Sequence, residues 1–245
     1  MIKVKNISKE FDKSPVLKGI STIFEKGKTN LIIGQSGSGK TVFLKCLLGL
    51  FETNSGQIFF ENSPINLMST KERTVLRQEI GMVFQGSALF DSMTVEENIM
   101  FPMQMFTKKD DDEVRERANQ VIKRVNLINA NEKYPDEISG GMKKRVAIAR
   151  SIVMNPKYLF CDEPNSGLDP KTAILIDNLI QEITEEYNIT TVINTHDMNS
   201  VVDIGDRIIY IEEGCKKWEG DKKTFLETDD KELHHFKSSS KLFTK

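Results

Sequence analysis

The chain has 245 residues, of which 38% are hydrophobic and 29% are charged, and its formal net charge is −2. This length permits one large domain or two lobes that share a core, and the composition indicates a soluble globular protein and excludes a disordered chain. The small net charge argues against general electrostatic attraction to nucleic acid or anionic lipid, so we expect no nucleic-acid partner.

The sequence contains no apolar run that approaches the ~20 residues needed for a membrane-spanning helix. Residues 1–7 alternate apolar and polar side chains like a half-buried strand and unlike a signal peptide. We therefore expect a cytoplasmic protein, and any membrane spans would belong to a partner chain. The cysteines Cys46, Cys161 and Cys215 lie far apart in sequence and are expected to be packed thiols in a reducing compartment.

The N-terminal third is predicted to consist mainly of strands. Residues 1–25 are expected to form short strands around a turn at Ser14-Pro15. A buried strand then leads into a glycine-rich loop and a helix. The further elements predicted here are a strand at residues 29–34, a helix at 40–50, and strands at 57–61 and 80–84.

The middle of the chain, residues 88–155, is predicted to be mostly helical. The acidic run from Asp110 to Glu113 opens a helix that extends to about Asn126, because acidic side chains offset the positive end of a helix dipole. The basic run Lys143-Lys144-Arg145 is interpreted as a solvated helix face.

Strands and helices alternate after residue 155. The strands are predicted at residues 157–162, 190–195 and 207–211, and the helices at 172–187 and 197–203. Such alternation predicts a largely parallel sheet flanked by helices. The helical region is then an insertion within an α/β core.

A phosphate-binding loop is predicted between the strand at 29–34 and the following helix, because residues 34–41 fit the pattern G-x-x-x-x-G-K-[ST]. Its glycines allow consecutive N–H groups to surround phosphate oxygens, and the helix directs its positive end at the same anion. Lys40 is expected to reach the β- and γ-phosphates, and Thr41 to hold Mg²⁺. The alternative is a Gly/Ser-rich turn that ends by chance in Lys-Thr. The candidate nucleotide-binding residues here are Gly34, Gln35, Ser36, Gly37, Ser38, Gly39, Lys40, Thr41 and Val42.

Two later strands are predicted to end in reactive side chains. Asp162 and Glu163 follow an apolar strand, and adjacent strand residues face opposite ways. Asp162 is therefore assigned to Mg²⁺, usually through water, and Glu163 to the attacking water as general base. His196 follows the strand that ends at Asn194 and is assigned a γ-phosphate contact, since strand ends of a parallel sheet gather around ligands. The alternatives are a solvated strand end for the two acids and a structural role for the histidine.

Ser139, Gly140 and Gly141 precede another predicted helix. Ser139 is a favourable N-cap, whereas each glycine is about 1 kcal/mol worse than alanine inside a helix. Packing alone is not expected to account for two glycines here. The close approach of an anion to bare backbone N–H groups would account for them.

These motifs resemble, over residues 1–220, the nucleotide-binding subunit of ABC transporters. Residues 34–41 resemble the Walker A motif, 160–163 the end of Walker B, 138–142 the ABC signature and 166–169 the D-loop. The residue after the signature glycines departs from the family, because Met142 stands where Gln or Glu is usual.

Further single residues match family positions. Gln85 matches the Q-loop glutamine, a catalytic residue and Mg²⁺ ligand, and His196 matches the switch histidine. Phe11 matches the aromatic residue that stacks on adenine, although tyrosine is commoner there. Asp169 lies in the element that resembles the D-loop.

The resemblance implies an α/β, P-loop NTPase fold of the ABC-ATPase type, with a RecA-like core, an N-terminal antiparallel β lobe and a helical insertion. It implies a single nucleotide-binding domain over residues 1–245. Its implied parts are a core with the β lobe at 1–87 and 156–220, a helical subdomain at 88–155 and a C-terminal extension at 221–245.

The resemblance also implies an ATPase that uses ATP and Mg²⁺ and works as a head-to-tail homodimer. Each ATP would be held by Lys40 and Thr41 of one chain and by Ser139 and Gly141 of the other. Dimer closure would move an integral membrane permease, which places the chain on the cytoplasmic face of the inner membrane.

Three segments narrow the resemblance to the ATPase of MCE-linked, Mla-type phospholipid transporters, which maintain outer-membrane lipid asymmetry. They are Gly-Gly-Met at residues 140–142, residues 84–102 and residues 39–45. This group implies phospholipid cargo moved between inner and outer membrane and an MCE-domain partner. The alternatives are an ATPase for amino acids, peptides or ions, an ABC protein that acts on ribosomes or DNA, and a P-loop kinase or GTPase.

Two local features, the segment at residues 85–106 and the pair His234-His235, can each be interpreted in two ways. Residues 85–106 are rich in Met and Phe, which predicts either the core of the helical lobe or a groove for a helix of the membrane partner. His234 and His235 are adjacent and without other ligands nearby in sequence. They are interpreted as part of an exposed tail and not as a metal site.

Overall fold

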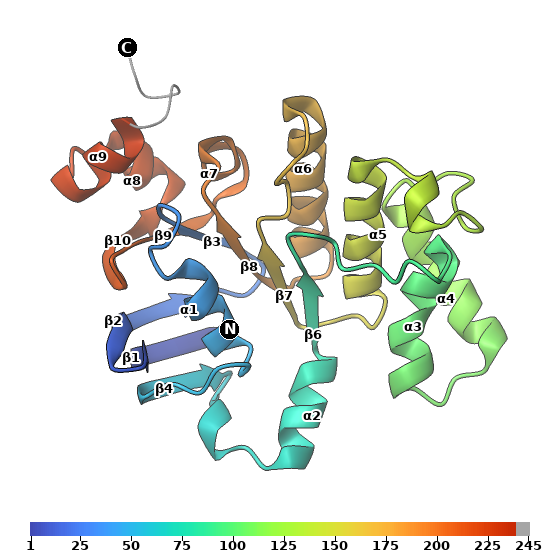
Figure 1. The fold of residues 1–245 in the computed structure, drawn as a ribbon, viewed down its shortest axis with the longest axis horizontal. Coiled ribbons are helices and arrows are strands. Elements are labelled where there is room, and N and C mark those ends of the chain that lie inside the picture. Colours follow the sequence, from blue (N-terminus) through green and yellow to red (C-terminus); the bar gives the residue numbers. More distant parts are fainter. Residues whose placement is uncertain (239–245) are drawn as a thin grey trace. The chain divides into compact units, whose positions relative to one another are not determined.

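The computed structural model describes residues 1–238, and of His234, His235 and Ser238 it describes the backbone only. The interpretation of the two histidines as an exposed pair therefore lies outside the described side chains. The chain divides into two units (Figure 1). The terminal unit comprises Met1–Arg73 and the chain from Thr190 onward, and the central unit comprises Thr74–Ile189.

An antiparallel sheet opens the terminal unit. Its order is β2 (Ser14–Phe24), β1 (Ile2–Phe11), β4 (Ser55–Phe60) and β5 (Ser63–Pro64). Asp12 and Lys13 connect β1 to β2 with φ of 47° and 64°, which is the left-handed geometry of a tight hairpin turn. The prediction of a turn at Ser14-Pro15 with short strands is wrong, because Ser14 already pairs with Phe11.

The second sheet of the terminal unit is mainly parallel. β3 (Thr29–Ile33) pairs in parallel with β8 (Thr190–Thr195) and with β9 (Arg207–Glu212), while β10 (Cys215–Asp221) is antiparallel to β9. Every residue of β3 and β8 is buried, as is usual for strands covered on both faces. The predicted strand and helix alternation is confirmed, because α1 (Lys40–Leu47) follows β3 and α7 (Met198–Ile204) follows β8.

The C-terminal end adds elements that the sequence did not predict. β10 leads into α8 (Lys222–Glu227) and α9 (Lys231–Ser238). The ring of Phe236 lies 4.9 Å from that of Tyr210 on β9, and Leu233 is fully buried. Helix α9 is therefore packed onto the terminal unit's sheet. Two further unpredicted elements are a 3₁₀ turn, Ile65–Leu67, and α2 (Thr70–Gln78). The boundary between the two units falls within α2, after Arg73.

The central unit combines a two-stranded parallel pair with helices. β6 (Ile80–Val83) pairs with β7 (Tyr158–Asp162), from Ile80 opposite Tyr158 to Val83 opposite Cys161. Its helices are α3 (Val95–Phe106), α4 (Asp111–Arg124), α5 (Gly140–Ile152) and α6 (Pro170–Glu186), with a 3₁₀ turn at Pro135–Glu137. Asp110 caps α4, so the predicted helix start is confirmed.

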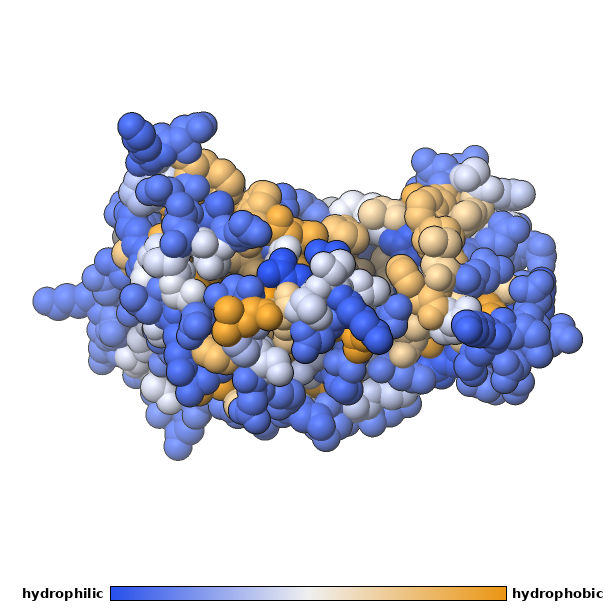
Figure 2. Space-filling view, turned by 90° about the horizontal axis from the view of Figure 1, so that it is seen from below, coloured by the Kyte–Doolittle hydropathy of each residue, from blue (hydrophilic) through white to orange (hydrophobic). Residues whose placement is uncertain are grey.

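The surface seen in Figure 2 is largely hydrophilic, with separate apolar patches. Cys46 and Cys161 are buried and no cysteine forms a disulfide, and burial raises the pKa of Cys46 to about 11. The expectation of packed thiols is thus confirmed for these two, while Cys215 is half-buried. Among the described residues, no helix has both the length and the hydropathy to cross a bilayer.

Candidate functional site

The predicted phosphate loop connects β3 to α1 in the terminal unit. Gly34, Gly37 and Gly39 have φ of 153°, 81° and 104°, which residues with side chains rarely adopt. A Cβ on Gly34 would lie 2.1 Å from the main-chain oxygen of Ile211, so only glycine fits. The left-handed Gly39 is the N-cap of α1, so the loop opens directly into the helix.

Lys40 is folded back into this loop. Its side chain is buried, and Nζ donates hydrogen bonds to the main-chain oxygens of Gly34 (2.7 Å) and Gln35 (2.9 Å). The Ser38 hydroxyl is buried and has no hydrogen-bond partner within residues 1–238. A cation and an unsatisfied hydroxyl inside a glycine-rich turn fit a bound phosphate chain, which would supply acceptor oxygens.

Other candidate residues of the terminal unit lie at strand ends. Thr41 is exposed at the start of α1, and its Oγ1 accepts a 3.4 Å hydrogen bond from Asn194 of β8. His196 is exposed immediately after β8. Phe11 ends β1 and is 39% exposed, with its ring centroid 5.3 Å from that of Phe51. The remaining loop residues Gln35 and Ser36 are exposed, and Val42 is half-buried.

The predicted acidic pair lies in the central unit. Asp162 ends β7, and Glu163 follows it with φ of 49°, a left-handed conformation that is unusual for this residue type. Both are half-buried. Gln85 is exposed, and its Nε2 donates a 3.4 Å hydrogen bond to Ser166 Oγ. Gln85 and Glu163 each lie two residues beyond the last pair of the β6–β7 ladder, so both emerge at the same strand edge.

Two helix starts in the central unit carry the remaining candidates. Ser139 caps α5, as predicted, by accepting a hydrogen bond from the Met142 N–H. Asp169 caps α6 through Thr172, and this hydrogen bond lowers the pKa of the Asp169 carboxyl. A Cβ on Gly141 would lie 2.7 Å from Cγ2 of Thr172. Packing against Thr172 therefore disfavours a side chain at Gly141, whereas a Cβ on Gly140 would make an ordinary 3.6 Å contact with Cδ2 of Leu168, and the assignment of both glycines to an anion stays a prediction.

The basic run is not a solvated helix face. Lys144 is only 4% exposed, and Arg145 donates a 2.7 Å hydrogen bond to the main-chain oxygen of Val125. Nζ of Lys144 donates to the main-chain oxygen of Gln85 and, at 3.5 Å, to that of Glu163. Burial lowers the pKa of Lys144, although Cys161 and Glu163 act in the opposite direction. Lys144 precedes Ala147 and Ile148 by three and four residues, which places it on the apolar face of α5. This spacing was the sequence signal that Lys144 is buried.

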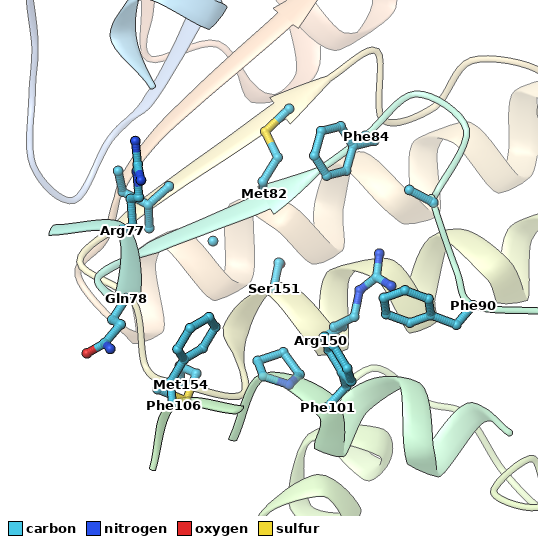
Figure 3. Close-up of a pocket in the computed structure, with 14 residues that line it drawn as sticks. Arg77, Gln78, Met82, Phe84, Phe90, Phe101, Phe106, Arg150, Ser151 and Met154 are labelled. Atoms are coloured by element: carbon cyan, nitrogen blue, oxygen red, sulfur yellow. The ribbon is translucent and has the colours of Figure 1, made fainter. Parts of the chain in front are cut away.

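An open cavity of about 320 Å³ lies in the central unit between β6, α3 and α5 (Figure 3). Arg150 points toward the ring of Phe90, with its guanidinium carbon 5.7 Å from the ring centroid, and burial lowers the pKa of Arg150. Met100 and Met103 are buried, which confirms the core interpretation for them. The aromatic residues that line the cavity are Phe84, Phe90, Phe101 and Phe106.

The loop that borders this cavity is held by one buried amide. Asn98 of α3 donates hydrogen bonds to the main-chain oxygens of Phe90, Met93 and Thr94, at 3.1, 3.1 and 2.9 Å. It also accepts one from the Phe90 N–H at 2.8 Å. The loop between β6 and α3 is therefore fixed from its helical side.

The expected Mg²⁺ ligands are oxygen donors. A hydroxyl (Thr41), an amide (Gln85) and a carboxylate (Asp162) suit a hard cation that retains several waters. Residues 1–238 contain no group of three or more His, Cys, Asp or Glu side chains that could hold a metal by themselves. Thr41 belongs to the terminal unit, and Gln85 and Asp162 belong to the central unit.

A buried lysine inside a glycine loop that opens a helix defines the P-loop class of nucleotide-binding proteins. The family described as "ABC transporter" matches residues 17–166, more than half of the chain. The arginine transport ATP-binding protein ArtM of Bacillus subtilis is 40% identical, and the match covers 92% of this chain and 93% of ArtM. The methionine import ATP-binding protein MetN of Clostridium tetani is also 40% identical, over 86% of this chain and 66% of MetN.

Solved structures agree with these relatives. CbiO1 of Clostridium perfringens, part of the ABC transporter complex CbiONQ, is 34% identical with a TM-score of 0.85, covering 96% of this chain and 92% of CbiO1. The dimeric ATP-binding cassette MJ0796 bound to ADP and Pi is 32% identical with a TM-score of 0.81, covering 90% of this chain and 98% of MJ0796. This chain belongs to the ABC transporter family as an ATP-binding, ATP-hydrolysing cassette.

The family match, the relatives and the solved structures support the general predictions and not the narrowest one. The fold class and the ABC ATPase assignment are confirmed. The narrower resemblance to MCE-linked lipid transporters finds no support in the relatives named above, which are described as amino-acid transport proteins. The chain spans about two thirds of the length of MetN.

Proposed function

We propose that this chain powers the import of an amino acid or a similarly small solute, as the ATPase subunit of an ABC transporter. The observation that carries the ATPase role is the loop of Gly34 to Gly39 with Lys40 held inside it. The cargo class is supported by the 40% identity to ArtM and to MetN, whose names specify arginine and methionine.

The candidate residues divide the chemistry between them. Lys40 and the loop N–H groups bind the β- and γ-phosphates, and Phe11 offers its exposed ring to the adenine. The hydroxyl of Thr41 and, from the central unit, the oxygens of Gln85 and Asp162 would be the protein ligands for Mg²⁺, and the ion would neutralise phosphate charge. Glu163 accepts a proton from the attacking water, and His196 donates a hydrogen bond to the γ-phosphate.

A second copy completes the proposed arrangement. Ser139, Gly140 and Gly141 at the start of α5, together with Asp169, approach the nucleotide bound by the other copy. The dimeric form of the MJ0796 cassette with ADP and Pi supports this assembly. A helix start with exposed N–H groups is suited to a phosphate.

The membrane partner is a separate permease. CbiO1, which is part of a transporter complex, supports such a partner and a peripheral position on the cytoplasmic face of the membrane. The cavity between β6, α3 and α5 is suited to a partner helix, because its aromatic and methionine side chains can adapt to an apolar surface.

Phospholipid transport is the second candidate. Residues 39–45, 84–102 and 140–142 favour it through their similarity to the ATPases of MCE-linked systems. In that case an MCE-domain lipid-binding protein joins the complex.

Affinity purification of the tagged full chain from its own detergent-solubilised membranes tests these proposals, with co-purifying proteins and lipids identified by mass spectrometry. A permease with a solute-binding protein is the expected result. A permease with an MCE-domain protein and bound phospholipid would instead establish the second candidate. Recovery of no permease would contradict the transporter role.

A further inference from the structure

Lys144 joins two catalytic segments through their backbones. It lies in α5 and is buried, and its ammonium donates to the main-chain oxygens of Gln85 and Glu163. Gln85 follows β6 and Glu163 follows β7. One cation of α5, the helix that Ser139 caps, thus contacts both loops.

The strand register explains how one side chain reaches both segments. The β6–β7 ladder ends at Val83 opposite Cys161, so Gln85 and Glu163 lie beyond the residues that these two strands pair with each other. The Glu163 oxygen also accepts a 3.2 Å hydrogen bond from the Ser166 N–H, and an ammonium has three N–H donors to share between the two segments. Lys144 therefore connects the segments that follow β6 and β7, beyond the last residue pair of these two strands.

The backbone of Glu163 itself requires support. Its φ of 49° is left-handed, and such a conformation persists in a residue with a side chain only when surrounding contacts hold it. This conformation sets the direction in which the carboxylate leaves the strand end. A hydrogen bond to the carbonyl of the same residue stabilises that direction.

We propose that Lys144 is a positioning residue that fixes Gln85 and Glu163 relative to each other for ATP hydrolysis. The inference rests on the roles proposed above for Gln85 and Glu163. Lys144 acts through their main-chain oxygens.

The variant Lys144→Met in the purified full chain tests the inference. It removes both hydrogen bonds but keeps a long apolar stem, and kcat for ATP hydrolysis should fall about tenfold. KM and the affinity for a fluorescent ATP analogue should remain unchanged, because the phosphate loop is untouched. Lys144→Arg, which keeps several donors, should recover most of the activity.

The neighbouring variant Lys143→Met is the matched control. Within residues 1–238 Lys143 makes no side-chain hydrogen bond or ion pair, so its removal should leave kcat unchanged. A raised KM with unchanged kcat in Lys144→Met, or no rescue by arginine, would overturn the positioning role.

A double-mutant cycle separates positioning from general stabilisation. In a Gln85→Ala background the loss caused by Lys144→Met should shrink to about threefold or less, since the main-chain oxygen remains but the Gln85 side chain that Lys144 positions is absent. An equal loss in both backgrounds would overturn the inference. A wild-type chain without ATPase activity would overturn the proposed function, whereas an active wild type with an equally active Lys144→Met variant would overturn this inference alone.

Discussion

Lys40 and Lys144 show how position decides the use of a buried lysine. Both donate to main-chain oxygens, but Lys40 does so inside a loop whose Ser38 hydroxyl has no partner among residues 1–238. Lys144 donates to two strand ends of the central unit. The first arrangement is suited to a bound anion, and the second to holding backbone in place.

Glu163→Gln should retain ATP binding and lose nearly all hydrolysis. The amide keeps the shape of the side chain but cannot accept the proton of the attacking water, which should lower kcat by about 10³-fold. ATP would then hold two copies together. Gel filtration with and without ATP should show a dimer only with ATP.

The control for this variant is Glu116→Gln, an exposed change on α4. It should hydrolyse ATP like the wild type. A Glu163→Gln chain that binds ATP yet elutes as a monomer in both runs would contradict the dimer scheme.

Single residues were predicted where a fixed spacing encodes the chemistry. The phosphate loop and the acidic pair were identified from residues 34–41 and 162–163, because their patterns are local in sequence. The contacts of Lys144 were not predicted, since Gln85 and Glu163 lie 59 and 19 positions away. The packing of Gly141 against Thr172 was missed for the same reason.

Elements were predictable where hydrophobic periodicity was strong. The buried strands β3 and β8 were found, whereas α2 was missed because its nine residues bury only Leu76. β10 was missed because none of its residues is fully buried and the segment reads as polar. The turn at Asp12-Lys13 was misplaced, because Pro15 gave a stronger turn signal than a pair that lacks glycine.

Asn98→Ala should release the loop between β6 and α3. One fully buried side chain makes four hydrogen bonds to this loop, three as donor and one as acceptor, and its removal takes these partners from the Phe90 N–H and the Met93 oxygen. We expect the free energy of unfolding to fall by about 2–3 kcal/mol. In hydrogen-exchange measurements, the exchange rate should increase most at the Phe90 amide, which loses its hydrogen bond to Asn98.

Gln104→Ala, an exposed change on the same helix, should alter the unfolding free energy by less than about 0.5 kcal/mol. Equal exchange at Phe90 in both variants would show that Asn98 does not hold the loop.

Glu219 connects three strands of the terminal unit. Burial alone would raise the pKa of its carboxyl, but hydrogen bonds from Lys216, Thr22 and Arg207 outweigh this and lower the pKa. A carboxyl with a lowered folded-state pKa stabilises the fold above its ordinary value of 4.5. That stabilisation is lost as the pH falls through the folded-state pKa.

Glu219→Gln should therefore lower the unfolding free energy by about 1 kcal/mol near neutral pH, after allowance for solvent screening. The difference from wild type should shrink in acid. Urea unfolding at about pH 7 and about pH 3 measures this. Glu213→Gln, an exposed change in the turn before β10, is the control, and a difference independent of pH would contradict the ion-pair explanation.

At the scale of the whole molecule, the cassette fold and the cargo are separate questions. The chain is equally identical, at 40%, to proteins named for methionine import and for arginine transport. Equal identity to cassettes named for different cargo means that identity alone does not specify the cargo of this chain. In the function proposed above the chain recognises a permease, and the aromatic cavity of the central unit is the surface proposed for that contact.

Phe106→Ala tests this contact in the complex. Phe106 lines the cavity and is 54% exposed, so its truncation should cost the isolated chain little stability. An aromatic anchor at the centre of an interface commonly contributes 2 kcal/mol or more, so recovery of the permease from membranes should fall about tenfold or more. ATP hydrolysis by the isolated chain should persist, because the cavity lies outside the candidate catalytic residues. Leu67→Ala, a 72% exposed change in the terminal unit, is the control, and equal recovery with both variants would place the permease on another surface.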